Sequence, residues 1–402
     1  MRKKEAFSFL DELQGKGIRL GLSRIKKFLS LIGSPEKRFK SVHVAGTNGK
    51  GSTATMIECI LRQAGFKTGL YTSPHLVRFN ERIRVNGKKI SDRELVKGIF
   101  ALKKEMEKSG IPLTYFEFIT ALAFRHFADS GVEIAVLEVG MGGRLDATNV
   151  VIPLVSVITN VSIEHEKHLG STVAQIAGEK AGIIKEKVPV VTSAQNNDAL
   201  SVIRRMCREK GSSLSIVQRP LLSGVGMKGL FQEWNASLAV AAVKQLKPSG
   251  FDIGKAAVEK GLSLAKISGR FDVVRKEPVV VLDCAHNPAC CVALADAFRS
   301  GFPGKRALLV FGASDSKNVM AMAERLAEIS KKVFVTGAKY RAMDTEKAAK
   351  MFEGLGIGIE IVEGVENAVK KAISCAKPDD IVLVAGSCFV AGEALGFLKK
   401  KE

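Results

Sequence analysis

The sequence predicts an α/β protein with two doubly wound, Rossmann-like domains, of which the C-terminal one is smaller. Short apolar runs, typical of buried strands, alternate along the chain with longer segments in which apolar residues recur at helical spacing. This alternation favours mostly parallel sheets flanked by helices. The chain has 402 residues, which is too long for one ordinary domain and sufficient for two.

The first domain begins with helical periodicity over residues 5–33, interrupted by a loop at residues 15–17. Further along, the patterns predict helices around residues 56–61 and over residues 116–127, and strands at residues 41–45, 68–73, 133–139 and 154–160. A glycine-rich turn follows the first of these strands directly.

A second series of elements begins near Pro278. It comprises a predicted helix at residues 289–298 and predicted strands at residues 279–282, 306–311, 332–336, 357–362 and 381–384. The boundary lies between residues 268 and 278, where a glycine and a proline flank charged residues. We therefore expect one domain at residues 1–272 and another at residues 273–402.

The composition is that of a soluble globular protein, with 46% apolar and 25% charged residues. The N-terminus lacks an apolar run with a cleavage site, and no run of about 18 apolar residues occurs, so we expect a cytoplasmic protein. The seven cysteines include no C-x-x-C pair. This favours buried free thiols in a reducing compartment over a zinc ribbon or a thioredoxin motif.

The net charge of +20 suits either nucleic acid or small polyanions such as nucleotides and polycarboxylates. The positive residues are spread along the chain, without a dense Lys/Arg block or an aromatic RNA-binding signature. We therefore favour a generally basic surface that suits small anionic ligands, and expect no nucleic-acid partner.

A glycine-rich segment, GTNGKGS (residues 46–52), lies between a predicted strand and a predicted helix. Its spacing differs from the usual phosphate loop because a glycine stands between Lys50 and Ser52. The physical requirements are still met: glycines let backbone N–H groups approach phosphates, Lys50 offsets their charge, and the helix N-terminus adds its dipole. A turn that only connects strand to helix is the alternative, but the position favours a P-loop ATPase-type domain.

Polar side chains also occur at the carboxyl ends of three predicted strands of the first domain. They are Ser73, Glu138 and His165. Ligands of open α/β sheets bind at this edge, and Mg²⁺ accepts a sparse protein shell when it also binds phosphates. Each residue taken alone is better explained by a structural role than by metal binding, and His is an unusual ligand for Mg²⁺. Together with the phosphate loop, the set indicates a magnesium site.

The second domain opens with DCAHNP, in which Asp283 and His286 follow a predicted strand. An Asn-Pro helix start explains part of this motif without any function. A polar cluster at a ligand-binding sheet edge is the functional interpretation.

These motifs together resemble the folylpolyglutamate synthase/dihydrofolate synthase branch of the Mur ligase family. The resemblance covers nearly the whole chain and is carried by stretches in family order: HVAGTNGKGS (43–52), TSPHLVRFNERI (72–83), TYFEFITALAF (114–124), LEVGMGGRLDATN (137–149), GEKAGIIK (178–185), LDCAHNP (282–288) and GSCFVAGE (386–393). The TSPHL and FNERI blocks resemble the folate branch rather than the cell-wall ligases.

For ATP and magnesium, the resemblance implies a role for each matching residue. The implied phosphate contacts are Gly49, Lys50, Gly51 and Ser52, and further nucleotide contacts are Asn235, Arg270 and Asp283. The implied magnesium ligands are Ser73, Glu138, His165 and Lys180, the last as a carbamate and in preference to Lys185. The residues implied to act in catalysis are Lys50, Lys180 and His286.

For the other substrates, the resemblance implies pterin-side contacts by Thr114, Tyr115, Phe116, Glu117, Leu145, Asp146 and Ala147, and places His286 and Ser387 near glutamate. The chain departs from the family pattern at Glu164, where Asp is common, and at Cys284, Cys388 and Phe389, where the family has Gly, Leu and Tyr. The last three positions bear on the glutamate site.

The reaction implied is ATP-dependent addition of L-glutamate to dihydropteroate, to tetrahydrofolate (poly)glutamates or to both, through an acyl phosphate, with Mg²⁺ as cofactor. The implied partners are small molecules, and we expect a monomer that binds neither nucleic acid nor membrane. One alternative is a Mur-type amino-acid ligase acting on another carboxylate, such as a UDP-sugar precursor. A nucleic-acid-stimulated ATPase is the other.

Overall fold

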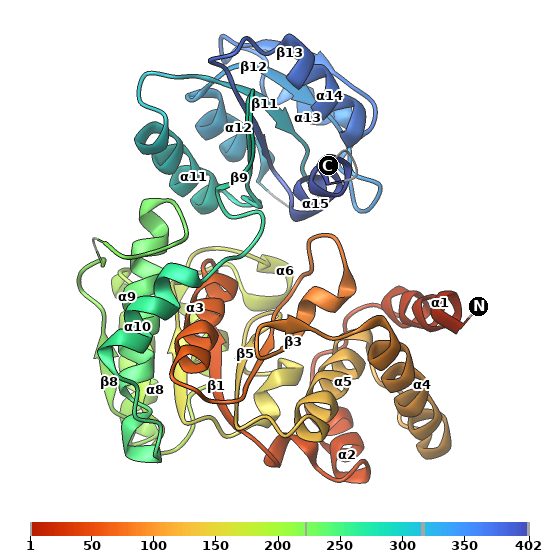
Figure 1. Cartoon of the computed structure of the whole chain (residues 1–402), viewed down its shortest axis with the longest axis vertical. Helices are drawn as coiled ribbons and strands as arrows, with labels where there is room; N and C mark the ends of the chain where they lie inside the picture. The colour runs from red at the N-terminus through yellow and green to blue at the C-terminus, as the bar shows by residue number, and fades with distance from the viewer. Residues whose placement is uncertain (1, 222, 315–317, 400–402) are drawn as a thin grey trace. The chain divides into compact units, whose positions relative to one another are not determined.

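The chain folds into two units (Figure 1). The computed structural model describes residues 2–221, 223–314 and 318–399, apart from the side chain of Lys167. The N-terminal unit comprises Met1–His75, Phe79–Gly224 and Trp234–Ala265, and the C-terminal unit comprises Leu76–Arg78, Val225–Glu233 and Lys266–Glu402. The domain boundary expected after residue 272 falls at the start of strand β9 (Asp272–Lys276).

Among the described residues, the sheet of the N-terminal unit has the strand order β4-β3-β2-β5-β1-β6-β7-β8. Neighbouring strands from β2 to β8 are parallel, whereas β3 pairs antiparallel with both β2 and β4. The strands are β1 (Lys40–Ala45), β2 (Thr68–Tyr71), β3 (Ile83–Val85), β4 (Lys88–Lys89), β5 (Ile134–Glu138), β6 (Val155–Ile158), β7 (Val190–Thr192) and β8 (Leu214–Ile216).

Helices pack on both faces of this sheet. On one face, helices α1, α2, α4 and α5 form an apolar core with Tyr71, Ala135 and Leu137 of the strands. Helix α3 packs against β1, β2 and β5, and α10 packs on α3. The helices of the N-terminal part are α1 (Arg2–Gly15), α2 (Ser23–Leu31), α3 (Lys50–Gln63), α4 (Asp92–Ser109), α5 (Tyr115–Asp129), α6 (Glu166–Leu169), α7 (Val173–Ala181), α8 (Asn197–Glu209), α9 (Leu230–Lys244) and α10 (Lys255–Leu264).

The C-terminal unit contains a second sheet, with the described strands in the order β13-β12-β11-β14-β10-β9. Only the β9–β10 pair is antiparallel among them. Helices α11 to α13 pack on one face of this sheet, and α14 and α15 pack on the other. These elements are β9, β10 (Val279–Leu282), α11 (Pro288–Gly301), β11 (Ala307–Phe311), α12 (Val319–Ala327), β12 (Ser330–Val335), α13 (Thr345–Lys350), β13 (Gly358–Ile361), α14 (Val365–Cys375), β14 (Ile381–Ala385) and α15 (Cys388–Leu398).

The predicted fold class is confirmed, and most predicted strands lie within two residues of the observed ones. Helix α4 was not predicted, although the sequence at its start has the pattern of a helix N-terminus. Ser91 and Glu94 form a reciprocal capping box at its N-terminus, and Gly110 ends the helix in the left-handed conformation.

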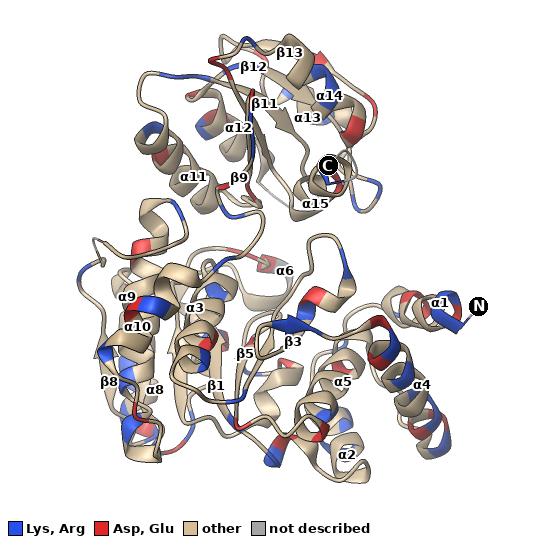
Figure 2. Ribbon diagram, viewed as in Figure 1, with Lys and Arg blue, Asp and Glu red and all other residues tan. Residues whose placement is uncertain are grey.

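Charged residues of both signs are distributed over the elements of both units (Figure 2). Helix α4, for example, carries four acidic and five basic residues in DRELVKGIFALKKEMEKS. The excess of positive charge is therefore not confined to one segment. In the described part of the chain, no helix is both long enough and apolar enough to span a membrane.

The contact between α3 and α10 depends on the absence of a side chain at Gly261. A Cβ atom there would lie 2.5 Å from Ile60 Cα and 2.7 Å from Ile60 N. Because these are backbone atoms, they move only if the helices separate.

We therefore predict that Gly261→Ala lowers the free energy of unfolding by about 1–3 kcal/mol, the usual cost of overpacking. Gly254→Ala is the matched control, because Gly254 precedes the same helix and has open space at its Cβ position. Denaturant unfolding of both variants tests this. Equal stability of the two variants would contradict the packing argument.

Candidate active site

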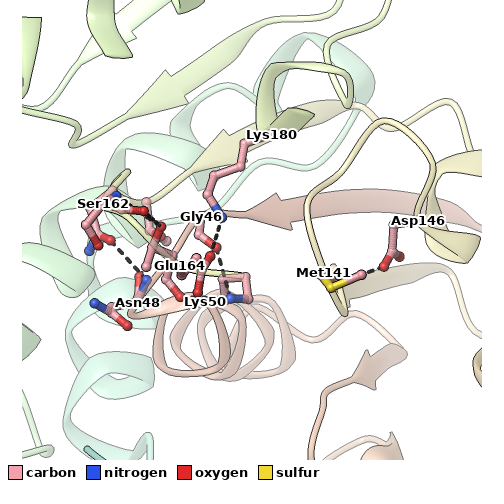
Figure 3. Close-up of polar contacts among 11 residues, drawn as sticks. Gly46, Asn48, Lys50, Met141, Asp146, Ser162, Glu164 and Lys180 are labelled. Carbon is pink, nitrogen blue, oxygen red and sulfur yellow. Dashed lines mark hydrogen bonds and ion pairs between the residues drawn. The ribbon is translucent and has the colours of Figure 1, made fainter. Parts of the chain in front are cut away.

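The predicted phosphate loop joins β1 to α3, as expected. Gly49 caps the helix in the left-handed conformation, with φ 82°, and Lys50 is the first helical residue. The Lys50 Nζ donates to the carbonyl oxygens of Gly46 and Thr47, both at 2.9 Å (Figure 3). Lys50 thus lies across the loop, at the helix N-terminus where backbone N–H groups and the helix dipole favour an anion.

The segment after β6 fixes the shape of the phosphate loop. Asn160 accepts hydrogen bonds from the backbone N–H groups of Thr47 at 2.8 Å and Asn48 at 2.9 Å, through its carbonyl and its side-chain oxygen respectively. The Thr159 hydroxyl donates to the Asn48 carbonyl at 2.6 Å. Sequence reasoning missed these two residues, although polar residues that follow a strand of the same sheet are a recognisable signal.

Two glycines of the loop are required by close contacts. Gly46 has φ 142°, and a Cβ there would lie 1.8 Å from the Thr159 hydroxyl oxygen. A Cβ at Gly49 would lie 2.3 Å from Oδ1 of Asn235. The structure therefore places Asn235, in α9, against the phosphate loop, next to the first turn of α3.

A buried charge pair lies beside the loop. The Nζ of Lys180, in α7, is 2.6 Å from an oxygen of Glu164, and the two residues are 0% and 8% exposed (Figure 3). Burial lowers the pKa of Lys180 to about 8, although the negative charge of Glu164 acts to raise it. Burial works against ionisation of Glu164 too, but the charges of Lys50 and Lys180 hold its pKa below the usual range.

The candidate magnesium ligands are brought together only in part. Glu138 ends β5, is buried, and accepts a hydrogen bond from the backbone N–H of Ser73 at 2.9 Å. His165 is exposed, has φ 47° and precedes α6, directly after Glu164. Across the described residues, no three His, Cys, Asp or Glu side chains are arranged to hold a metal ion.

On the predicted pterin side, Thr114 and Glu117 form the capping box of α5. The Glu117 carboxylate accepts from the Thr114 N–H at 2.8 Å and also pairs with Arg24. The Phe116 ring fills the space where a Cβ on Gly140 would lie, and Tyr115 faces Arg82. Both side chains of the capping box are thus used inside the protein.

The loop at residues 139–147 contains the other predicted pterin contacts. Asp146 is buried and accepts from the N–H groups of Met141 and Thr148, both at 3.0 Å. Burial raises the pKa of Asp146, although these hydrogen bonds act to lower it. Leu145 is half-buried and Ala147 is buried. The contact of Phe116 with Gly140 brings this loop beside the start of α5.

In the C-terminal unit, the polar residues after β10 and β14 lie at one sheet edge. Asp283 accepts from the N–H groups of Phe271 and Ala285, both at 2.7 Å. Burial raises the pKa of Asp283 to about 6, while the charge of Arg270 opposes this shift. His286 Nδ1 is 2.8 Å from the carbonyl oxygen of Cys284, and Ser387 caps α15.

Two of the positions that depart from the family pattern are neighbours at this edge. The Sγ of Cys388 is 3.8 Å from the carbonyl oxygen of Cys284. Hydrogen bonds with Cys284 and His286 hold the pKa of the Cys388 thiol below its usual range. All seven cysteines are free thiols, as predicted. The prediction that they are buried is wrong for Cys375, which is exposed, and for Cys290 and Cys388, which are only partly buried.

Family models match both units of the chain. The model described as the Mur ligase middle domain matches residues 44–218, and the model described as the Mur ligase, glutamate ligase domain matches residues 269–388. The two matches contain the phosphate loop and the DCAHNP motif respectively.

Among named relatives, a probable bifunctional folylpolyglutamate synthase/dihydropteroate synthase of Haloferax volcanii is 38% identical over 98% of this chain. The chain spans 50% of that protein and 51% of a similarly named protein of Halobacterium salinarum, that is, about half the length of each. A dihydrofolate synthase/folylpolyglutamate synthase of Bacillus subtilis is 34% identical, over 95% of this chain and 96% of that protein.

Solved structures resemble the whole chain. Mycobacterium tuberculosis folylpolyglutamate synthase, complexed with ADP and AMPPCP, has a TM-score of 0.89 and 32% identity, over 98% of this chain and 99% of that chain. Escherichia coli FolC, in complex with DHPP and ADP, has a TM-score of 0.87 and 29% identity, over 98% of both chains. A Yersinia pestis bifunctional folylpolyglutamate synthase/dihydrofolate synthase, complexed with AMPPNP and Mn ion, has a TM-score of 0.88 and 28% identity, over 99% of this chain and 98% of that chain.

The fold and the matches to both units thus define the class of the protein, that of the Mur ligases. The chain belongs to the Mur ligase family, in the branch of folylpolyglutamate synthases and dihydrofolate synthases.

The phosphate loop leads to a prediction for Gly49→Ala. The added methyl group collides with Asn235. The alanine must also adopt the left-handed backbone conformation of Gly49, which costs about 1–2 kcal/mol. We expect ATP affinity, measured by calorimetry, to fall by at least about tenfold, equivalent to 1.4 kcal/mol.

Gly65→Ala is the control, because Gly65 follows the same helix with φ 94° and open space at its Cβ position. It should lose stability in the same way and keep its ATP affinity. Equal ATP affinity of both variants would show that the close contact between Gly49 and Asn235 is not needed for ATP binding.

Proposed function

We propose that the chain is an ATP- and Mg²⁺-dependent ligase that joins L-glutamate to the carboxylate of dihydropteroate, of tetrahydrofolate (poly)glutamates or of both. The products are the amide, ADP and phosphate. The observation that carries the proposal is a phosphate loop whose Lys50 lies beside the buried Glu164–Lys180 pair, in a Mur ligase middle domain. The names of the relatives and the nucleotides and DHPP in the solved structures support it.

The chemistry requires activation of the carboxylate, because an oxide ion is a poor leaving group. The folate-side carboxylate attacks the γ-phosphorus of ATP, and ADP leaves with the bridging oxygen. The acyl phosphate that results is then attacked by the amine of glutamate. The tetrahedral intermediate loses phosphate together with the carboxylate oxygen that bridged to phosphorus, and the amide forms. No covalent bond to the protein is needed, so catalysis rests on positioning and electrostatics.

We expect the Lys50 ammonium to bind the phosphoryl group while it is transferred. This ammonium now binds the carbonyl oxygens of Gly46 and Thr47, which are weaker partners than a phosphate. The backbone N–H groups at the start of α3 bind the remaining phosphate oxygens, and Asn235 contacts the nucleotide beside Gly49. Arg270 and Asp283 are the proposed nucleotide contacts of the C-terminal unit.

The donor set near the loop fits Mg²⁺. Glu138 supplies a buried carboxylate, and Ser73, whose N–H donates to that carboxylate, carries a hydroxyl at the same sheet edge. Mg²⁺ typically binds one or two carboxylates plus substrate phosphates. Glu138, Ser73 and His165 would hold the ion, with Lys180 after carbamylation. When bound, Mg²⁺ offsets the charge on the phosphate oxygens.

For the other substrates, we propose that residues 114–117 and 145–147 form the pterin side. Of these residues, Tyr115, Phe116 and Leu145 are half-buried and the others are buried, so these three are the ones that we expect to contact a ligand directly. His286 and Ser387 are the proposed glutamate-side residues, and His286 is the proposed catalytic residue of the C-terminal unit. We further propose a cytoplasmic monomer with small-molecule partners and without a nucleic-acid partner.

The proposed function predicts phosphate release that requires ATP, Mg²⁺, glutamate and a folate-side substrate together. Dihydropteroate and tetrahydrofolate are offered in separate reactions, and phosphate is measured. Turnover with both indicates a bifunctional enzyme, and turnover with one identifies that activity.

Two control reactions address the alternatives. Glutamate-dependent turnover only with a UDP-linked carboxylate would indicate a different Mur-type ligase, and stimulation by DNA or RNA would indicate a nucleic-acid-dependent ATPase. Folded, ATP-binding protein that turns over neither folate-side substrate would refute the proposal.

A separate prediction concerns carbamylation of Lys180. Carbon dioxide reacts with a neutral amine, and a pKa of about 8 leaves a larger neutral fraction at neutral pH than an ordinary lysine has. A carbamate beside Glu164 would repel that carboxylate, so the 2.6 Å ion pair belongs to the unmodified state. The carbamate should therefore increase as the pH rises towards and through 8.

Carbon-13 NMR with labelled bicarbonate is the measurement. A carbamate signal in the wild type that is absent in Lys180→Met is expected, with Lys185→Met as the control that retains it. The same signal in both variants, or its absence from the wild type at pH 8, would overturn the assignment.

A further inference from the structure

His43 is a buried titratable residue that the proposed reaction does not use. It lies on β1, between β5 and β6, and its side chain is 0% exposed. Its Nε2 is 2.8 Å from the hydroxyl oxygen of Thr148, which is also 0% exposed. A polar ring in the middle of a sheet costs free energy unless its hydrogen bonds are made, so this contact requires an explanation.

Asp146 is the third member of this hydrogen-bond chain, after His43 and Thr148, and it determines the direction of the hydrogen bonds. The Thr148 hydroxyl is 2.5 Å from Oδ1 of Asp146, which also accepts the Thr148 N–H at 3.0 Å. Both oxygens of Asp146 accept backbone N–H groups, Oδ1 from Thr148 and Oδ2 from Met141, and these hydrogen bonds favour the ionised carboxylate against the effect of burial on its pKa. An ionised carboxylate only accepts, so the single hydroxyl proton of Thr148 points to Asp146. The hydroxyl oxygen must then accept from His43, whose proton is therefore on Nε2.

The surroundings of the ring agree with this tautomer. Nδ1 of His43 is buried without a hydrogen-bond partner among the described residues, which is more tolerable for an acceptor than for an N–H donor. Burial, with the charge of Lys185 in addition, lowers the pKa of His43 to about 3, so the ring is neutral at physiological pH. His43 thus acts as a fixed donor.

Asp146 is the last residue of this hydrogen-bond chain, and its hydrogen bonds hold the loop at residues 139–147. Its second oxygen accepts from the Met141 N–H at 3.0 Å (Figure 3), and its backbone carbonyl accepts from Asn149. The loop contains glycines at 140, 142 and 143, which leave its backbone little intrinsic preference. Its conformation therefore depends on hydrogen bonds such as those to Asp146.

We propose that His43 is a positioning residue for this loop: through Thr148 it holds Asp146, and so aligns the pterin side of the site with the phosphate loop. The alignment is direct because β1 continues from His43 to Ala45, and the phosphate loop begins at the next residue, Gly46. One strand thus supports both reaction partners. The identity of the ligand on the pterin side rests on the proposed function, whereas the hydrogen-bond chain does not.

Kinetics of four variants test the proposal. Thr148→Val keeps the shape and removes the hydroxyl, and His43→Leu removes the donor. Each should raise the KM for the folate-side substrate by about tenfold, the equivalent of one lost buried hydrogen bond, and leave the KM for ATP within about twofold. Thr148→Ser and His43→Gln keep a hydroxyl and an N–H donor respectively, and should restore most of the wild-type KM.

Thr192→Val is the matched control for general destabilisation. Thr192 is likewise 0% exposed, on β7 of the same sheet, and its hydroxyl oxygen accepts from the Ala194 N–H rather than from the loop. It should lower the melting temperature without changing either KM. Equal increases in both KM values for Thr148→Val, or no increase in the folate-side KM, would overturn the proposal.

A second measurement needs neither variants nor activity. Nitrogen-15 NMR of the imidazole in the wild-type protein should show His43 as the neutral Nε2–H tautomer. The Nδ1–H tautomer, or a protonated ring at neutral pH, would overturn the hydrogen-bond chain. Failure of the wild type to turn over any folate would instead refute the proposed function, and the tautomer would still decide this inference.

Discussion

The buried ion pair between Glu164 and Lys180 is the interaction on which the candidate nucleotide site depends. Placing two charges in the interior is costly, and removing one partner of such a pair typically costs about 3–5 kcal/mol. Here the carboxylate of Glu164 is close to two cations, Lys180 at 2.6 Å and the neighbouring Lys50. While Lys180 is unmodified, one anion between two cations leaves this cluster positive, which suits the phosphates of ATP.

The fold places most of the groups around this pair at strand ends along one sheet edge, and Lys180 reaches Glu164 from helix α7. The phosphate loop follows β1, Glu138 ends β5, and Asn160 and Glu164 follow β6, and these three strands are adjacent in the sheet. Parallel strands carry their carboxyl ends to the same side, so residues far apart in sequence meet there. The same geometry lets β1 support the phosphate loop at one point and the proposed pterin-side loop at another.

The sequence predicted those features that arise locally. Strands and helices follow from apolar periodicity, and the phosphate loop follows from its glycines and its position. Asn160 accepts a hydrogen bond from Asn48, 112 residues away, and His43 is hydrogen-bonded to Thr148, 105 residues away. These are tertiary contacts with no local pattern. Thr114 and Glu117 were assigned to substrate, although their spacing is also that of a capping box, which the structure forms.

The central claim is that this site transfers a phosphoryl group to a carboxylate. It is tested most directly by labelling the folate-side carboxylate with oxygen-18 and analysing the inorganic phosphate by mass spectrometry. The account predicts one labelled oxygen in each phosphate released with amide formation, because that oxygen bridges carbon and phosphorus in the acyl phosphate. Phosphate without label, released at the same rate as the amide forms, would contradict it.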